Sequence, residues 1–188
     1  AIDTSRSMLA EDINPNRLER AKLAALDLMK ICKNDRLGLV GFAGSAFLQC
    51  PLTLDEEAFR QSVAALDVKS MPQRGRALAE TIQAAEAAFK DEAQNHKVLV
   101  ILTDGEDHDG GAVAAAQKAA KGGLKIFTIG IGSPAGELIR LPGEAGKNNF
   151  LKDASGNVVK TRLNETLLRE ISGAGADGGF YLNLRGID

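Results

Sequence analysis

Four oxygen-bearing side chains in this sequence have the types and the spacing that a hard metal ion requires. Asp3, Ser5 and Ser7 alternate along one short segment, and Asp104 follows an apolar run much later in the chain. Mg²⁺ takes roughly six oxygen ligands in proteins and usually keeps several waters. Two carboxylates in one place repel each other unless a positive charge lies between them. These residues therefore predict a divalent-cation site with few anionic ligands, which would leave the ion able to accept a carboxylate from a partner.

Simpler explanations exist for the same residues, because Asp and Ser also cap helices and turns. The acidic run 106–109 has two interpretations as well: a second metal cluster, or solvated residues that cap the next helix, and we favour the second. Arg17 and Arg20 fall on a predicted helix, and we expect both on its solvated face.

The elements that must position these residues follow from apolar runs and turn signals. Strands are predicted at 37–42, 97–102, 124–131 and 179–184, with a short return strand at 46–49 that Pro51 ends. Helices are predicted from about Pro15 to Cys32, after Asp55, at about 77–93 and 112–121, and after Asn164 to about Ile171. A small exposed hairpin is expected at about 148–160.

This order of elements requires strand–helix–strand crossovers, which are characteristic of α/β proteins. We expect a doubly wound, mostly parallel sheet with one antiparallel edge strand and helices on both faces, in a single domain over residues 1–188. Only two residues precede Asp3, so the first strand is expected to be truncated. Ligands of such sheets bind beyond the carboxyl ends of the strands, where Asp3 and Asp104 are placed.

The bulk composition excludes several classes of partner. The net charge is −2 and aromatic residues make up 4% of the chain, so neither a nucleic acid nor an anionic membrane is expected to bind. No apolar run approaches the roughly 20 residues that cross a bilayer. Cys32 and Cys50 have no CxxC spacing; free thiols are expected, and a disulfide between them stays open.

The motifs together resemble a known family. Asp3-x-Ser5-x-Ser7, Gly75-x-x-Leu78 and Leu102-Thr103-Asp104-Gly105 are similar to the metal-ion-dependent adhesion site of von Willebrand factor A domains. Longer strings resemble the bacterial aerotolerance-operon (Bat) subgroup: 5–8 (SRSM), 15–18 (PNRL), 42–47 (FAGSAF), 50–53 (CPLT) and 104–108 (DGEDH).

The resemblance implies a protein-interaction module whose Mg²⁺, Mn²⁺ or Ca²⁺ ion docks an Asp or Glu of a protein partner. It also implies a parent protein anchored in the bacterial inner membrane, with this part outside the bilayer, and a connection to a chaperone ATPase system. The metal ligands would be Asp3, Ser5, Ser7 and Asp104. The rim that meets the partner would be formed by Arg6, Gly105 and Glu106.

Arg76 departs from the family pattern, because it stands where a metal-binding Thr is expected. A guanidinium cannot bind a cation, but it can pair with Asp3 or Asp104 and supply the positive charge itself. Three outcomes therefore remain open: a weakened metal site, a metal-free scaffold, or a solvated Arg76 without effect. A metal-dependent phosphohydrolase is a further alternative, but the sequence has no phosphate-binding P-loop and no GxSxG motif, so we expect no catalysis.

Overall fold

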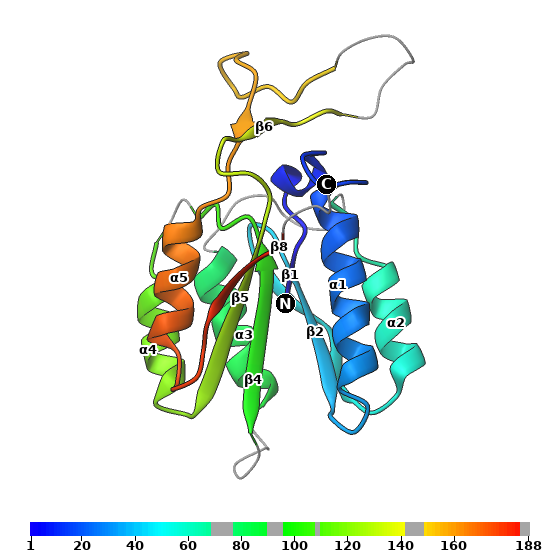
Figure 1. The fold of residues 1–188 in the computed structure, drawn as a ribbon, viewed down its shortest axis with the longest axis vertical. Coiled ribbons are helices and arrows are strands. Elements are labelled where there is room, and N and C mark those ends of the chain that lie inside the picture. The colour runs from blue at the N-terminus through cyan, green and yellow to red at the C-terminus, as the bar shows by residue number, and fades with distance from the viewer. Residues whose placement is uncertain (69–76, 90–95, 108–109, 142–148, 185–188) are drawn as a thin grey trace.

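The fold is a six-stranded sheet covered by helices on both faces (Figure 1). The computed structural model describes residues 1–68, 77–89, 96–107, 110–141 and 149–184. The strands are β1 (Ile2–Asp3), β2 (Leu37–Phe42), β3 (Ala46–Thr53), β4 (Lys97–Thr103), β5 (Leu124–Ile131), β6 (Glu137–Leu138), β7 (Lys160–Thr161) and β8 (Tyr181–Leu184). The helices are a short 3₁₀ helix, η1 (Arg6–Leu9), and α1 (Arg17–Ile31), α2 (Glu56–Ala64), α3 (Ala77–Ala88), α4 (Ala112–Ala120) and α5 (Glu165–Ala174).

The strand order is β3-β2-β1-β4-β5-β8, and only β3 runs antiparallel to its neighbour. The predicted α/β architecture, with a mostly parallel sheet and one antiparallel edge strand, is therefore confirmed. The return strand is longer than predicted, because β3 continues through Pro51 to Thr53. Proline is tolerated there because β3 is an edge strand, and its register with β2 shifts at this point.

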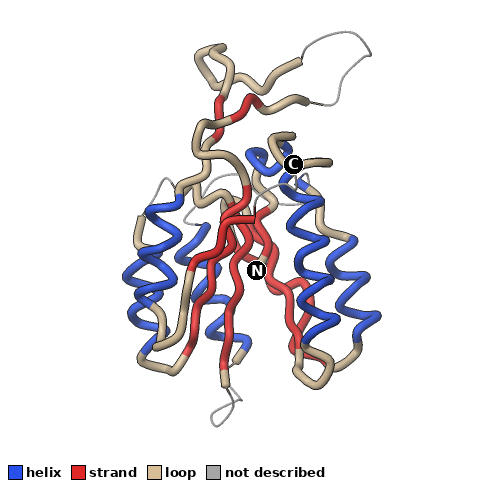
Figure 2. The backbone as a smooth tube through the Cα atoms, viewed as in Figure 1, coloured by secondary structure: helices blue, strands red, loops and turns tan. Residues whose placement is uncertain are grey.

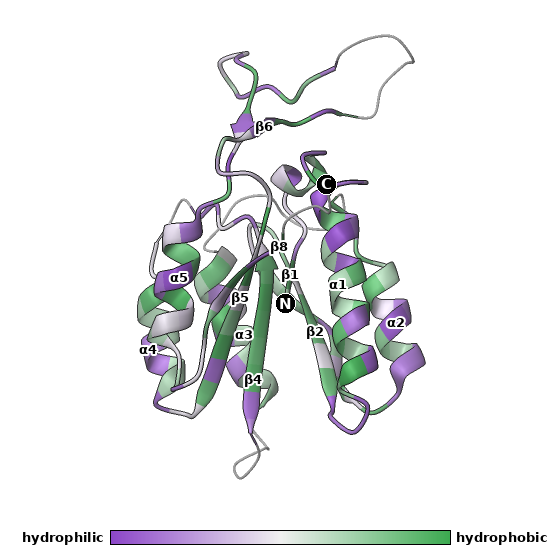
Figure 3. Ribbon diagram, viewed as in Figure 1, coloured by the Kyte–Doolittle hydropathy of each residue, from purple (hydrophilic) through white to green (hydrophobic). Residues whose placement is uncertain are grey.

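Helices lie on the two faces of the sheet (Figures 1 and 2), and an apolar core lies between the helices and the sheet on each face. One core joins α1 and α2 to the sheet, and the other joins α3, α4 and α5 to the opposite face. Successive residues of β4 serve different cores, since Ile101 packs in the second and Leu102 in the first. This alternation follows from the period of two along a strand, and Figure 3 shows the apolar residues concentrated in the central strands.

Side-chain caps explain where two of the helices begin. The carboxylate of Asp55 accepts hydrogen bonds from the backbone N–H groups of Glu57 and Ala58. The amide oxygen of Asn164 accepts one from Leu167. Both caps were predicted from the sequence. The prediction that the acidic run 106–109 caps the next helix is wrong, because α4 begins after Gly111, which has a positive φ and makes no side-chain cap.

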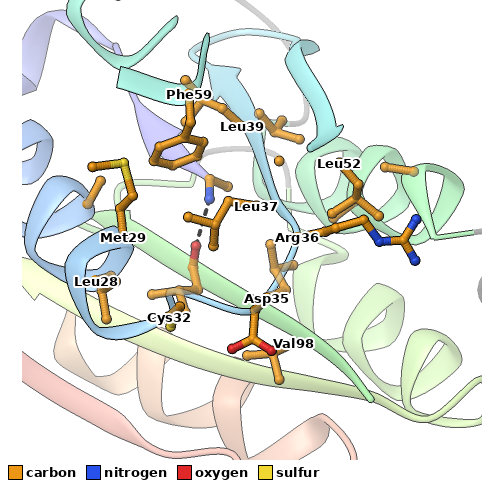
Figure 4. A pocket seen from close by; sticks show the side chains of 18 of the residues that line it. Leu28, Met29, Cys32, Asp35, Arg36, Leu37, Leu39, Leu52, Phe59 and Val98 are labelled. Carbon is orange, nitrogen blue, oxygen red and sulfur yellow. Dashed lines mark hydrogen bonds between the residues drawn. The ribbon is translucent and has the colours of Figure 1, made fainter. Parts of the chain in front are cut away.

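A cavity of about 730 Å³ lies between the N-terminal halves of β2 and β4 (Figure 4). β1 fills the space between these strands only at Ile2 and Asp3, and side chains such as Met29 and Leu39 line the cavity. The α-amino group of Ala1 also lies there and donates a 2.7 Å hydrogen bond to the carbonyl oxygen of Val100. The cavity is at the opposite end of the strands from Asp3 and Asp104.

Within the described part of the chain, no helix combines the length and the apolar character that a bilayer crossing needs. Both cysteines are free thiols, Cys50 buried and Cys32 half-buried, as the sequence predicted.

Candidate metal centre

Asp3 lies at the carboxyl end of β1, in the middle of the sheet, and its side chain is held by two donors. The backbone N–H of Ser5 donates to Oδ1 over 2.8 Å, and the hydroxyl of Thr103, the last residue of β4, donates to Oδ2. Asp3 is only 3% exposed. The parallel pairing of Ile2 with Leu102 places these two strand ends side by side. We call this edge of the sheet, at the carboxyl ends of β1, β4 and β5, the site edge.

Ser5 and Ser7 bring two hydroxyl oxygens together beside Asp3. Their Oγ atoms are 2.8 Å apart. Ser5 precedes η1 but makes no side-chain cap on it, so the simpler capping explanation does not account for its hydroxyl. The Ser5 side chain is also among the groups that lower the pKa of Asp3. The hydroxyls of Ser5 and Ser7 therefore contact each other next to the Asp3 carboxylate, and the metal site predicted for these residues stays a prediction.

Asp104 is fully buried at the next strand end and has three hydrogen-bond partners. Its Oδ1 accepts from the backbone N–H of Glu106 over 3.1 Å. Its Oδ2 accepts from Nη1 of Arg17 over 2.9 Å and from the hydroxyl of Thr161 over 3.1 Å. One of the two predicted carboxylates is therefore already paired with the positive charge of a basic side chain.

Arg17 supplies this charge, and the expectation that it lies on a solvated helix face is wrong. Its side chain is fully buried. Nε and Nη2 form a bidentate pair with Asp12, at 2.8 and 2.7 Å, while Nη1 contacts Asp104 and Thr161. The residue begins α1, but its side chain reaches away from the helix into the loops of the site edge.

The backbone after β5 leaves room for this guanidinium and donates to the carboxylate that holds it. Gly132 has a φ of +125°, and a Cβ atom at this position would lie 2.6 Å from Cζ of Arg17. The N–H of Ser133 donates to the Asp12 carboxylate that holds Arg17. Although burial alone would lower the pKa of Arg17, the hydrogen bond to Asp12 and the charges of Asp104 and Asp12 raise it above its ordinary value. Arg17 therefore stays charged and links α1, β4 and the segment after β5.

The two acidic residues of the site edge are in different electrostatic states. Burial raises the pKa of Asp3, and the charge of Asp104 raises it further, to about 7, against the hydrogen bonds from Thr103 and Ser5. Among the residues that the structure describes, no basic side chain pairs with Asp3. Asp3 is thus an anion that its surroundings destabilise, next to two neutral oxygens. This donor set fits a hard divalent cation.

The predicted rim residues occupy three different environments. Arg6 is exposed on η1. Gly105 is buried against α5, since a Cβ atom there would approach Leu168 to 2.9 Å. Glu106 is half-buried, and its Oε1 accepts the backbone N–H of Arg162 over 2.9 Å, so it is not a freely solvated residue. Burial and the charge of Asp104 raise its pKa.

Part of the predicted site lies outside the described residues, namely Arg76 and the pair 108–109. Where the structure describes the chain, no group of three or more His, Cys, Asp or Glu residues is arranged to hold a metal ion, so the candidate centre depends on hydroxyl oxygens beside Asp3. Sequence analysis missed Arg17 as a site residue, together with Asp12 and Thr161. The string 15–18, which contains Arg17, served in the sequence analysis only as evidence of resemblance to the Bat subgroup.

Comparison with known proteins shows the family of the chain. The family model of the von Willebrand factor type A domain matches residues 1–106. A UPF0353 protein from Mycolicibacterium paratuberculosis is 34% identical, over 73% of this chain and 45% of the relative. The chain therefore spans less than half the length of such curated relatives.

Solved structures are similar over nearly the whole chain. BatB from Bacteroides thetaiotaomicron superposes with a TM-score of 0.92 at 36% identity, covering 99% of this chain and 88% of the other. An aerotolerance-related membrane protein from Bacteroides fragilis gives 0.89 at 38% identity, covering 97% and 88%. Proximal thread matrix protein 1 from the mussel byssus, in a structure with a zinc-occupied adhesion-site motif, shares only the fold: its TM-score is 0.66 at 15% identity, covering 98% and 42%. The chain belongs to the von Willebrand factor A domain family, and its fold is similar to that of BatB.

Proposed function

We propose that this domain is a protein-interaction module that holds a divalent cation at the site edge and presents it to an Asp or Glu side chain of a partner. Mg²⁺ is the expected ion, with Mn²⁺ or Ca²⁺ as substitutes. The observation that carries the proposal is the cluster formed by the Asp3 carboxylate and the hydroxyls of Ser5 and Ser7. Burial and a neighbouring anion oppose the ionised form of Asp3, and a bound cation would relieve both effects.

The residues have different roles in this proposal. Asp3, Ser5 and Ser7 would hold the ion. Asp104 would contribute its charge from a position that Arg17 and Thr161 fix. A bound cation supplies the electrostatic attraction for a partner carboxylate, and few anionic ligands leave that attraction strong. The zinc-occupied motif of the mussel protein is a precedent for a metal ion on this fold.

A metal-free scaffold is the second candidate, and the Arg17–Asp104 ion pair is the observation that favours it. The sequence raised this alternative for Arg76, with a guanidinium in place of the ion. The described structure has a guanidinium on Asp104, but it comes from Arg17. In this second candidate, partner binding would not respond to chelators or to substitution of Ser5 and Ser7.

We propose a non-catalytic role, and phosphoester hydrolysis is the enzymatic alternative. His96 directly precedes β4, whereas Asp104 directly follows it, so this histidine lies at the opposite end of the strand from the site. No turnover of a generic phosphate ester is expected with or without Mg²⁺. Chelator-sensitive turnover that Asp104→Ala abolishes would contradict this.

The parent protein is proposed to be anchored in a bacterial inner membrane and to serve an assembly or stress-tolerance system that includes a chaperone ATPase. The similarity to an aerotolerance-related membrane protein supports this setting. The domain described here would be the part of the parent that meets partners outside the bilayer.

Calorimetric titration with Mg²⁺ and Mn²⁺ tests the metal site directly. Asp3→Asn should weaken binding by at least about tenfold. Asp27→Asn is the matched control, because that carboxylate is exposed and its ion pair in the described structure is with Lys30 on α1, so the substitution should leave the affinity unchanged. Arg76→Thr should strengthen binding. A folded chain that binds neither ion at millimolar concentration would support the metal-free scaffold instead.

A further inference from the structure

An antiparallel arm extends from the domain beyond the site edge (Figure 1). We define it as residues 134–162, of which the structure describes 134–141 and 149–162. At its base β6 pairs with β7, Glu137 opposite Thr161 and Leu138 opposite Lys160. Two further bridges continue the pairing outward, Arg140 opposite Phe150 and Lys152 opposite Val158. The arm is thus a ribbon with a defined register.

The base of the arm is bonded directly to the candidate metal centre. The Thr161 hydroxyl accepts a hydrogen bond from Arg17 and donates one to Asp104. The N–H of Arg162 donates to Glu106. These contacts fix the arm beside Asp104, so a partner that docks at the site edge also meets the base of the arm.

The arm is positively charged, whereas the rest of the domain is negative. Residues 134–162 contain five basic and three acidic side chains, a net charge of +2 in a chain whose total is −2. The remainder of the chain therefore carries −4. An arm of this sign at the rim of a cation site attracts acidic groups and steers their approach.

The carboxylates of the described part of the arm accept hydrogen bonds from the arm's own backbone. Asp153 accepts the backbone N–H groups of Ser155 and Asn157, and these hydrogen bonds form its inner turn. Glu137 accepts the N–H of Leu138. The basic side chains are exposed, and none of them has an ion pair with a described residue: Arg140, Lys152, Lys160 and Arg162. Their charge is therefore available to a partner.

The register places Arg140, Lys152 and Lys160 on one face of the ribbon, and the side chains of Lys160 and Arg162 both lie beside Gly136. Directly paired residues share a face, and so do residues two apart along a strand. The residues connected in this way are Leu138, Arg140, Phe150, Lys152, Val158 and Lys160. The Arg140 guanidinium lies 5.9 Å from the centre of the Phe150 ring, as this arrangement requires. We call this surface the cationic face of the arm.

We propose that the cationic face binds an acidic, extended segment of the protein partner whose carboxylate docks at the metal centre. Neighbouring cations such as Lys160 and Arg162, two residues apart in the chain, can each meet one of the alternate side chains of an extended peptide. The half-buried Phe150 and exposed Val158 add apolar contact between the charges. A long polyanion would extend past the arm, and the negative charge of the remainder of the domain would repel it. This inference rests on the proposed function and names the class of partner that it serves.

Fluorescence anisotropy with a labelled peptide of five Glu-Ala repeats tests the proposal on the full chain. Lys160→Glu/Arg162→Glu should weaken binding by at least about tenfold at low salt and make the salt dependence shallower. Lys160→Gln/Arg162→Gln should give an intermediate loss. Lys118→Glu/Lys121→Glu is the matched control, because it makes the same change of charge on and just after α4, and it should alter affinity by less than about threefold. Circular dichroism would verify that each variant is folded.

The outcomes separate this proposal from the metal site. If chelation leaves peptide binding unchanged but the arm reversal weakens it, the cationic face is supported and the metal site is not. If Mg²⁺ strengthens binding and the arm reversal has no effect, the cationic face is refuted while the metal site stands. Equal losses in the arm and control variants would also refute it. The cationic face would also be refuted as a peptide site if vesicles containing phosphatidylserine bound more tightly than the peptide and the arm variant alone lost that binding.

Discussion

Replacing Arg17 by methionine removes the guanidinium and keeps most of the apolar length of the side chain. Methionine and arginine have similar helix propensities, so the start of α1 should tolerate the change. What is lost is a bidentate pair with Asp12 and one charged hydrogen bond to each of Asp104 and Thr161. The Asp104 carboxylate would remain, fully buried and without its counter-charge.

Removing one partner of a buried ion pair costs about 3–5 kcal/mol, because the other charge is left buried and uncompensated. Arg17 compensates two acids, although the Asp12 side chain is 7% exposed and keeps the N–H of Ser133. We therefore expect Arg17→Met to lower the free energy of unfolding by about 3–5 kcal/mol at neutral pH. Asp104→Asn in the same chain should restore at least about 1 kcal/mol, because it removes the uncompensated charge.

Urea denaturation of the single and double variants measures both quantities. Arg20→Met is the control on the same helix, since Arg20 is half-buried and its substitution should cost less than about 1 kcal/mol. A second readout is the increase in the free energy of unfolding on addition of Mg²⁺. Without the positive charge of Arg17, the added stabilisation by Mg²⁺ should be larger than in the unaltered chain. A loss below about 1 kcal/mol for Arg17→Met, or strict additivity with Asp104→Asn, would refute the view that Arg17 neutralises Asp104.

Two further predictions concern residues next to this ion pair. The pKa of Asp3 is raised to about 7, so the folded state holds this proton more tightly than the unfolded state. As pH rises from about 4 to 7, the free energy of unfolding of the unaltered chain should therefore fall by up to about 4 kcal/mol more than that of Asp3→Asn. Mg²⁺ should raise Tm more at pH 8 than at pH 6, because Asp3 is ionised at the higher pH. Gly132→Ala should cost about 1–3 kcal/mol more than Gly156→Ala, measured by urea denaturation. Both glycines have positive φ, but an added Cβ meets Arg17 at Gly132 and nothing within 4 Å at Gly156.

Much of this architecture was predictable because it depends on local signals. The apolar runs of β4 and β5 and the caps Asp55 and Asn164 are properties of neighbouring residues. Topology then places Asp3 and Asp104 together, since parallel strands end at one edge of the sheet. The continuation of β3 through Pro51 was missed because a strand's edge position is a property of the whole sheet.

The burial of Arg17 was not predictable from helical periodicity. A charged residue in the first turn of an amphipathic helix is normally solvated. Here the side chain is covered by segments that are distant in sequence: Asp12 before the helix, Asp104 after β4, and Thr161 at the base of the arm. Gly132, which leaves room for the guanidinium, is the closest sequence signal, and it becomes informative only once the fold is known.

The two carboxylates differ in whether a basic side chain is paired with them, and this difference affects how an ion would bind. If Arg17 neutralised both Asp3 and Asp104, an ion would gain little by binding. If it neutralised neither, two buried anions would destabilise the fold and hold an ion so strongly that a partner carboxylate added little. Arg17 contacts Asp104, and within the described residues no basic side chain pairs with Asp3. The Asp3 carboxylate is therefore left without a paired cation beside two hydroxyls, and an ion bound there would still attract a third carboxylate, brought by a partner.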